Sequence, residues 1–491
     1  MNESSHPSTV LPDCERDSRR EIHFSPTLTA LCLMVCLCGF GVLLWSAFFS
    51  EGIRESATAS RDLERLASRL LGFESRLSEL SAVEQAIFRV GEEDGDTREQ
   101  IRLWCAELPQ DRRKPLDTLY VGILDGEANL SDDLRQSMRE WSPEIAPFPT
   151  FRQIVDVVYV GKDTADVDYT ILQARLAEEV PANWFYFQLA GRLASQSGNE
   201  ALRESLHRQF QQFTDPQLWK WRMLVVVELS LGGIGFICFV FVVVRWMNLK
   251  ADFSRPTAVL RFNQRISPWT FQEGMAVFVR GGALSILLIA LLSIVPYGVN
   301  ILEDYGSLLL YLPTVGFAMV FLCRSRSQSF LEVIGCKHVS QVFRSSLPII
   351  MSVMALGLMG DWLIMLAGKT FGISTHWTEW FLPQLVWGSQ AELLKTTIEI
   401  VVLAPVFEEI IFRGIVYSTL RVKFGFPVSM IGSAAFFALA HGYGPVAFLS
   451  VLWSGMLWAW LYERTGSIIP GICVHAVNNG LVVYFLVAMF R

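Results

Sequence analysis

The sequence predicts an all-α protein: a polytopic bundle of transmembrane helices with a mostly helical hydrophilic insert after the first helix. Hydrophobic residues make up 52% of the 491-residue chain, which is more than an ordinary soluble globular protein contains. These residues also gather in separate runs, each close to the about 20 residues that a helix needs to cross the hydrocarbon core of a bilayer. Composition and its distribution along the chain therefore give the same fold class.

The first apolar run, residues 27–50, predicts a retained transmembrane anchor rather than a cleaved signal peptide. It is longer than the apolar region of a typical signal peptide, and no small-x-small cleavage site follows it. The polar residues 1–26 before it predict a disordered tail. Eight further runs bring the expected number of helices to about nine: 223–244, 281–299, 306–323, 347–371, 394–420, 427–442, 444–462 and 467–490.

Basic residues in the loops predict the orientation in the membrane. Lys and Arg gather in 245–265 and 324–344, whereas the loops near 300–306 and 372–392 contain neither. Because basic loops stay in the cytoplasm, we expect a cytoplasmic N-terminus and an extracytoplasmic domain at 51–222, in a multi-pass protein of the plasma (inner) membrane. The formal net charge of -7 excludes a generally basic surface, so no nucleic-acid partner is expected.

The extracytoplasmic domain begins with a helical pattern. Apolar residues from Leu63 to Ile87 follow a three-four spacing that is broken at Glu84. Two interpretations of this seam stay open: packing within its own domain, or pairing in a homodimer through 63–87.

A second helical pattern, 181–213, contains a turn at Gly198-Asn199. Cys105 is the only cysteine of the domain, so no disulfide is expected within it. The domain shows no catalytic constellation, and its role is left open.

The chemistry is expected where ionisable groups lie inside apolar helices, because they cost several kcal/mol there unless they are paired or functional. Glu409 and Arg413 are four residues apart, so they share a helix face and can neutralise one another. Glu408 points about 100° away around the helix and has no partner on it. Such a carboxylate is a candidate general base. The alternative is one structural network of both glutamates with Arg413.

Two later helices add histidines. His441 ends the apolar run 427–442, and His475 and Asn479 lie one turn apart on one face of the last helix. A lone histidine in a helix is more often a satisfied core residue. At 1.5 Å per residue, however, Glu408 lies about 20 Å from either end of its helix, and His441, His475 and Asn479 lie about 21, 12 and 18 Å along theirs. All four residues can therefore converge near the middle of the bilayer.

Three motifs follow one another on successive helices: EExxxR at 408–413, FxxxH at 437–441 and HxxxN at 475–479. In this order they resemble the CAAX protease and bacteriocin-processing (CPBP, or Abi) family, which includes the type II CAAX prenyl endopeptidases. The resemblance covers about 394–490, and residues 462–467 are also similar to family members. It covers nothing in 1–270.

The resemblance implies an intramembrane endopeptidase and a role for each motif residue. Glu408 and His441 would activate a water molecule. His475 and Asn479 would donate hydrogen bonds to the oxyanion of the tetrahedral intermediate. Glu409 and Arg413 would hold the helix and orient the site. Amide hydrolysis needs such a base and such donors.

The need for a metal is open at the level of sequence. Two histidines and a glutamate could make a catalytic zinc site, and its ligands would be Glu408, His441 and His475. No HExxH motif is present, and Asn479 is better suited as an oxyanion donor than as a ligand. We favour a mechanism that requires no cofactor.

The predicted substrate is a membrane-associated protein or lipidated peptide, cut in CAAX-type or bacteriocin/leader-type processing. We divide the membrane part into helices two to five with their loops, 223–393, and a catalytic core, 394–491. The alternative function is a non-catalytic immunity or scaffold protein on the same fold, although every motif position is filled. A transporter with a proton relay is less favoured, because the helices show no evident inverted repeat.

Overall fold

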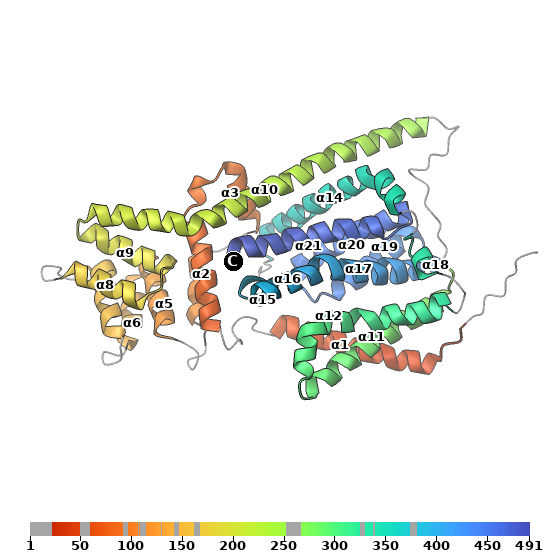
Figure 1. The fold of residues 1–491 in the computed structure, drawn as a ribbon, viewed down its shortest axis with the longest axis horizontal. Helices are drawn as coiled ribbons and strands as arrows, with labels where there is room; N and C mark the ends of the chain where they lie inside the picture. The colour runs from red at the N-terminus through yellow and green to blue at the C-terminus, as the bar shows by residue number, and fades with distance from the viewer. Residues whose placement is uncertain are drawn as a thin grey trace, which may run out of the picture.

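The computed structural model describes residues 22–491, apart from eleven internal stretches: 50–58, 92–96, 107, 109–113, 129, 142–146, 162–166, 252–266, 325–328, 337–338 and 374–380. The described residues form helices and no strand, which confirms the predicted all-α class. Figure 1 shows a cluster of short helices at one end of the molecule and a bundle of longer helices at the other. The predicted tail, apart from its last residues, lies outside the described residues.

The insert is made of short helices packed around their own apolar core. This core takes side chains from nearly every helix of the insert, and α9 begins at its predicted place with Asn183 as its N-cap. The helices are α2 (Ala59–Glu74), α3 (Ala82–Gly91), α4 (Thr97–Ala106), α5 (Pro115–Glu127), α6 (Ser131–Glu140), α7 (Phe148–Val155), α8 (Tyr169–Glu179) and α9 (Trp184–Gln196), with the short segments η2 (Leu77–Glu79) and η3 (Asp156–Val160).

Helix α10 (Glu200–Ala251) joins the insert to the bundle. The predicted turn precedes it, and Gly198 takes a positive φ of 67° there, which a residue without Cβ adopts freely. The helix packs on α9 at its beginning and on α14 (Val339–Thr370) in the bundle. The boundary that we expected at 222 falls inside this helix. Figure 1 shows α10 as one continuous element.

The apolar seam of 63–87 is buried inside the chain itself. Leu63 belongs to the core of the insert, while Leu66, Phe73 and Leu80 pack with residues of α10 and of α21 (Ile469–Phe490). The seam therefore packs inside the chain, partly within its own domain and partly against α21 of the bundle. A homodimer through 63–87 is not supported, because its main contact residues already have partners within the chain.

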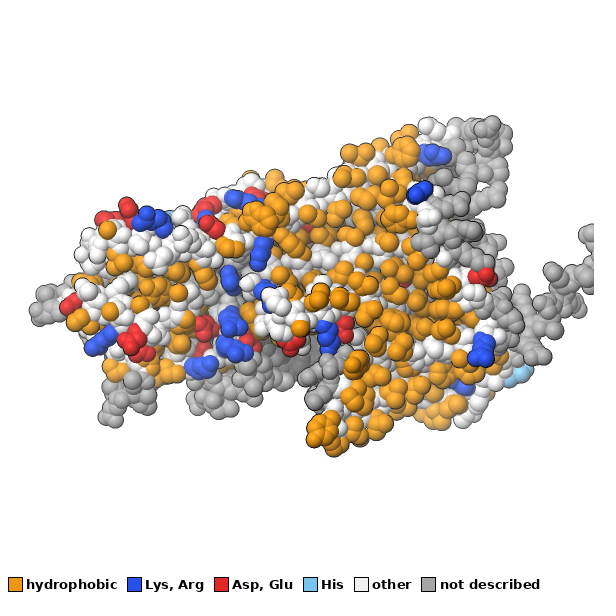
Figure 2. Space-filling model, viewed as in Figure 1, with side chains coloured by type: hydrophobic (Ala, Val, Ile, Leu, Met, Phe, Trp, Pro, Cys, Tyr) orange, Lys and Arg blue, Asp and Glu red, His pale blue; other side chains and the backbone are white. Residues whose placement is uncertain are grey.

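Seven helices of the described residues are long and apolar enough to cross a membrane. Figure 2 shows their hydrophobic side chains covering the bundle, whereas charged side chains are frequent on the insert. The chain is thus a multi-pass membrane protein. The spans lie in α1 (Pro26–Phe49), α10, α11 (Phe271–Ile294), α12 (Gly298–Phe317) with η4 (Ala318–Cys323), α14, α20 (Pro445–Thr465) and α21.

The predicted count of about nine spans is not confirmed, because two of the predicted runs differ from a simple span. The run 427–442 forms α19 (Phe426–Leu439), which has only 14 residues. The run 394–420 changes its helical register several times along α16 (Gln390–Ile398), η7 (Glu399–Leu403), α17 (Ala404–Glu408), η8 (Glu409–Tyr417) and α18 (Ser418–Lys423). The short run 427–442 and the irregular run 394–420 both carry motif residues.

Candidate active site

The helix that carries Glu408 is π-helical on both sides of one α-helical turn. Segments η7 and η8 flank α17, which ends at Glu408. The wider π register leaves backbone groups without their α-helical partners, and such bulges occur frequently at functional sites. Hydrophobic periodicity does not reveal this register, because it does not report which carbonyl each backbone N–H reaches.

The register change leaves the carbonyl of Ile400 free. The N–H of Ala404 donates to Glu399, five residues back, and is therefore not available to Ile400 as it would be in an α-helix. The next N–H in the π register would come from Pro405, which has none. Asn479 fills the gap, because its Nδ2 donates to the Ile400 carbonyl at 2.9 Å. The third motif thus satisfies an otherwise unpaired backbone carbonyl close to Glu408.

Glu409 and Arg413 form a fully buried ion pair, as the i, i+4 spacing predicted. Arg413 Nη1 lies 2.9 Å from Glu409 Oε1, and both side chains are 0% exposed. Arg413 also donates through Nη2 to the carbonyl of Gly455 at 3.0 Å. Its guanidinium lies over the rings of Phe437 and Trp458, at 4.7 and 5.2 Å. This arginine therefore ties three helices together.

His475 lies between the two glutamates. Its Nδ1 is 3.2 Å from Glu409 Oε1, and its Nε2 is 3.5 Å from Glu408 Oε2. The imidazole stacks on Trp458 with ring centroids 4.0 Å apart, so its plane is fixed. Only 3% of the His475 side chain is exposed. The first and third motifs thus meet directly.

Glu408 has a partner that the sequence analysis missed. The hydroxyl of Tyr311, on α12, donates to Glu408 Oε1 at 2.6 Å. Our expectation concerned only partners on the same helix, and Tyr311 reaches Glu408 from another one. Tyr311 lies in an ordinary apolar run, and nothing in the sequence distinguishes it there.

His441 reaches the site by a less direct route. The sequence predicts His441 at the end of its apolar run. Helix α19 ends at Leu439, so His441 lies in the turn that follows the helix. Its Nδ1 faces the carbonyl of Phe437 at 2.8 Å. Because a carbonyl accepts, Nδ1 carries the proton and Nε2 is the basic nitrogen. The ring of Phe437 contacts both histidines, with centroids 4.7 Å from His441 and 5.7 Å from His475.

Gly471 is a further residue that the sequence did not single out. A Cβ built on it would lie 2.8 Å from Glu409 Oε2, so only glycine leaves room for the buried carboxylate. The glycine follows Pro470 near the start of α21, where it looks like part of a helix boundary. The close contact depends on how α21 packs against η8 and cannot be read from neighbouring residues.

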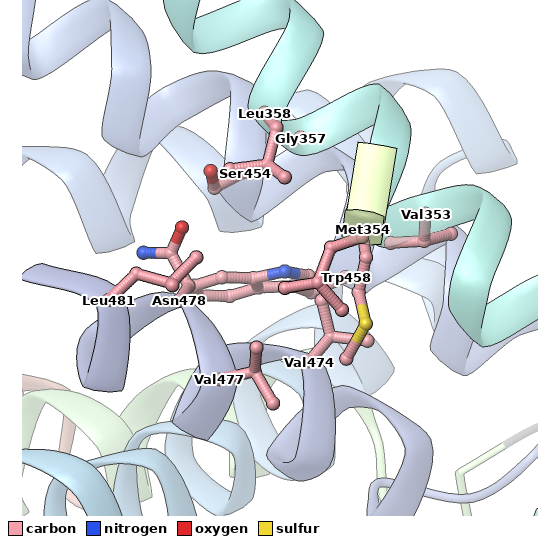
Figure 3. A pocket seen from close by; sticks show the side chains of 11 residues that line it. Val353, Met354, Gly357, Leu358, Ser454, Trp458, Val474, Val477, Asn478 and Leu481 are labelled. Atoms are coloured by element: carbon pink, nitrogen blue, oxygen red, sulfur yellow. The ribbon is translucent and has the colours of Figure 1, made fainter. Parts of the chain in front are cut away.

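A small, mostly apolar cavity lies beside Trp458 and is lined by residues of α10, α14, α20 and α21. Figure 3 shows Asn478 and Ser454 among its apolar lining residues, beside the indole of Trp458. Asn478 therefore borders this cavity, while the neighbouring Asn479 bonds to Ile400.

The alternative zinc site, Glu408, His441 and His475, is not seen as a three-ligand group in this structure. No group of three His, Cys, Asp or Glu side chains in the described part of the chain is placed to hold a metal ion. Both nitrogens of His475 face carboxylates, and His441 is held by a backbone carbonyl.

Residues 390–481 match the family model described as type II CAAX prenyl endopeptidase Rce1-like. The resemblance seen in the motifs is confirmed. The match includes all seven motif residues and indicates a membrane protease, and it covers well under half of the chain. Tyr311 and the insert lie outside it. Neither a curated protein nor a solved structure matches the chain significantly.

Proposed function

We propose that the chain is an intramembrane endopeptidase that hydrolyses a peptide bond of a membrane-associated protein. The observation that supports this most strongly is the position of His475, which links Glu408 to the buried pair of Glu409 and Arg413. A carboxylate and an imidazole are thereby held in fixed positions inside a mostly apolar bundle. Such preorganisation is what general base catalysis of amide hydrolysis requires.

In this mechanism Glu408 and His441 activate the water. Oε1 of Glu408 is occupied by Tyr311, so Oε2 is the oxygen that takes the proton. The basic Nε2 of His441 orients the water. Glu409 and Arg413 do not react, and they fix His475 in place.

Asn479 and His475 are the proposed oxyanion donors, the imidazole through Nε2, which lies at the long distance of 3.5 Å from Glu408 Oε2. The amide nitrogen of Asn479 carries two N–H groups, and one of them donates to Ile400. We assign the second to the tetrahedral intermediate. Losing one such donor should lower kcat by about 10²–10³-fold and change KM little. Asn479→Ala also frees the Ile400 carbonyl, so its thermal unfolding must be measured alongside its kinetics.

The proposed mechanism requires no metal. Cleavage should therefore survive prolonged incubation with a chelator followed by desalting. If the treated enzyme is inactive and zinc alone restores it, the metal-free mechanism is wrong. Glu408, His441 and His475 would then be the residues to test as ligands.

The proposed substrate is a membrane protein or a lipidated peptide cut near its C-terminus, in CAAX-type or leader-type processing. Comparing the membrane proteome of cells with the wild-type protein and with Glu408→Ala should reveal proteins whose termini change. Ser307→Ala is the matched control, because Ser307 bonds to a different carboxylate, Glu399. If all three strains have the same termini, a non-catalytic immunity or scaffold role is favoured.

We also propose that the N-terminus is cytoplasmic and the insert extracytoplasmic in the plasma (inner) membrane. The loops that predict this orientation lie partly outside the described residues. Ser195 lies on the insert and Ser340 at the start of α14, and both are exposed. Single cysteines at these positions, in a background without the native cysteines, should label oppositely with an impermeant maleimide. Labelling of Ser340→Cys alone in intact cells contradicts this orientation.

A further inference from the structure

Tyr311 is the contact of Glu408 that comes from outside the family-matched segment. It lies on α12, and its hydroxyl donates to Glu408 Oε1 at 2.6 Å. The match begins at residue 390, so it cannot include this contact. Helix α12 packs against both α17 and η8, the segments that carry Glu408 and Glu409.

The tyrosine ring is held so that its hydroxyl must point at the carboxylate. It stacks on Phe407 with centroids 5.6 Å apart and planes 8° from parallel. Phe407 directly precedes Glu408, so stacking and hydrogen bond fix the ring against the same turn of helix. The preceding residue, Leu310, accepts a hydrogen bond from Ser285 of α11 at 2.8 Å, which anchors α12 at this level.

The two oxygens of Glu408 therefore have different neighbours. Oε1 accepts from Tyr311 on α12, and Oε2 faces Nε2 of His475 on α21 at 3.5 Å. A carboxylate with one partner can rotate about its terminal torsion, which is broad and nearly two-fold. Contacts from two helices on opposite sides restrict this rotation and present Oε2 to the site. A base that moves by about 1 Å can lose about 10²-fold in rate.

The same helix offers an internal comparison. Ser307 lies one turn before Tyr311, and its hydroxyl donates to Glu399 Oε1 at 3.2 Å. Helix α12 thus presents two hydroxyl groups to two carboxylates on the facing helix. Only the bond of Tyr311 reaches a carboxylate that also contacts His475.

We propose that Tyr311 is a positioning residue for the reaction, because it holds Oε1 of Glu408 and leaves Oε2 to take the proton of the water. This inference rests on the proposed peptidase function. It extends the active site to α12 and makes the family-matched segment incomplete by itself. The tyrosine reaches the substrate only through Glu408, so its effect should appear in turnover and not in substrate binding.

The test compares Tyr311→Phe with Ser307→Ala, each full-length and in lipid nanodiscs, on a substrate that the wild type cleaves. Tyr311→Phe keeps the ring and its stack, so thermal unfolding should stay close to that of the wild type. Its kcat should fall by about 10²-fold and its KM should change less than about twofold. Ser307→Ala should keep both constants, because it loses an equivalent bond at another carboxylate. Equal kcat for Tyr311→Phe and the wild type overturns the inference, as does an equal fall of kcat in both variants.

Phe407→Leu is the second variant, in case Tyr311→Phe unfolds. It removes the stack and leaves the hydroxyl, so kcat should fall below that of the wild type, by less than about 10²-fold, again at unchanged KM. A change in KM alone overturns the inference. If the wild type itself cleaves nothing under conditions in which it is folded, the proposed function fails, and this outcome is distinct from a Tyr311→Phe enzyme that is fully active.

Discussion

Two arginine–glutamate pairs of this chain have the same chemistry and very different surroundings. In the membrane bundle, Arg413 and Glu409 lie 2.9 Å apart and neither side chain is exposed. In the insert, Arg203 and Glu200 lie 2.6 Å apart on the surface of α10, with 55% and 65% of their side chains exposed. Water and ions screen the second pair, whereas the first has only protein around it.

The distance between two charged groups therefore does not show by itself how much an ion pair contributes to stability. Replacing one member of the buried pair leaves a charge that has lost its closest counter-ion and that solvent cannot screen. The exposed pair returns to water at little cost. The buried pair of the bundle therefore contributes to its stability in a way that the exposed pair of the insert cannot.

The largest expected effect belongs to Arg413→Met. It leaves Glu409 buried without its cation, which should destabilise the protein by about 3–5 kcal/mol. Thermal and denaturant unfolding in detergent would measure this loss. The double variant Glu409→Gln/Arg413→Met should recover most of it, because no unpaired charge remains. If the single variant unfolds like the wild type, the pair is not as strongly buried as the structure shows.

Gly471→Ala should have the next largest effect on stability. Its Cβ would lie 2.8 Å from Glu409 Oε2 and would push the carboxylate away from His475, at a cost of about 1–3 kcal/mol. Gly480→Ala on the same helix is the matched control, since its Cβ would lie 3.9 Å from its nearest contact, Val401. Comparing the two unfolding midpoints separates the steric effect from helix propensity. Equal midpoints contradict the tight packing around Glu409.

A smaller, pH-dependent effect is expected in the insert at Arg76. This arginine bonds to Glu79 and to Thr214 and Asp215 of α10, and its bond to Glu79 lowers the pKa of that carboxyl below 4.5. A lowered folded-state pKa stabilises the fold above the unfolded value, and this contribution is lost as the pH falls through the folded value. Wild-type stability should therefore decrease below about pH 4.5 more steeply than that of Arg76→Ala. Parallel curves would show that the bond contributes nothing.

The smallest expected effect is that of Arg203→Ala. The pair with Glu200 is exposed and near the start of α10, so its loss should change stability by less than about 1 kcal/mol. Chemical denaturation in low and high salt would show whether even this contribution is screened. A loss of stability as large as that of Arg413→Met would contradict the proposed difference between the exposed and the buried pair.

The sequence predicted those features that depend on near neighbours along the chain. The pairing of Glu409 with Arg413 follows from their spacing, and the motif order was enough to indicate the family. The π register around Glu408 was not predictable, because apolar periodicity does not report which carbonyl each N–H reaches. Tyr311 and Gly471 were missed for a related reason: their contacts join positions far apart in the chain.

The central claim is that Glu408 reacts while Glu409 holds the site together. Measuring cleavage and thermal unfolding for Glu408→Gln and Glu409→Gln side by side tests it most directly. We expect Glu408→Gln to be inactive with an unchanged Tm, because the amide keeps the shape of the side chain and cannot take a proton. Glu409→Gln should lower the Tm, since it leaves Arg413 buried without a charged partner. Equal losses of activity at equal stability would contradict the claim.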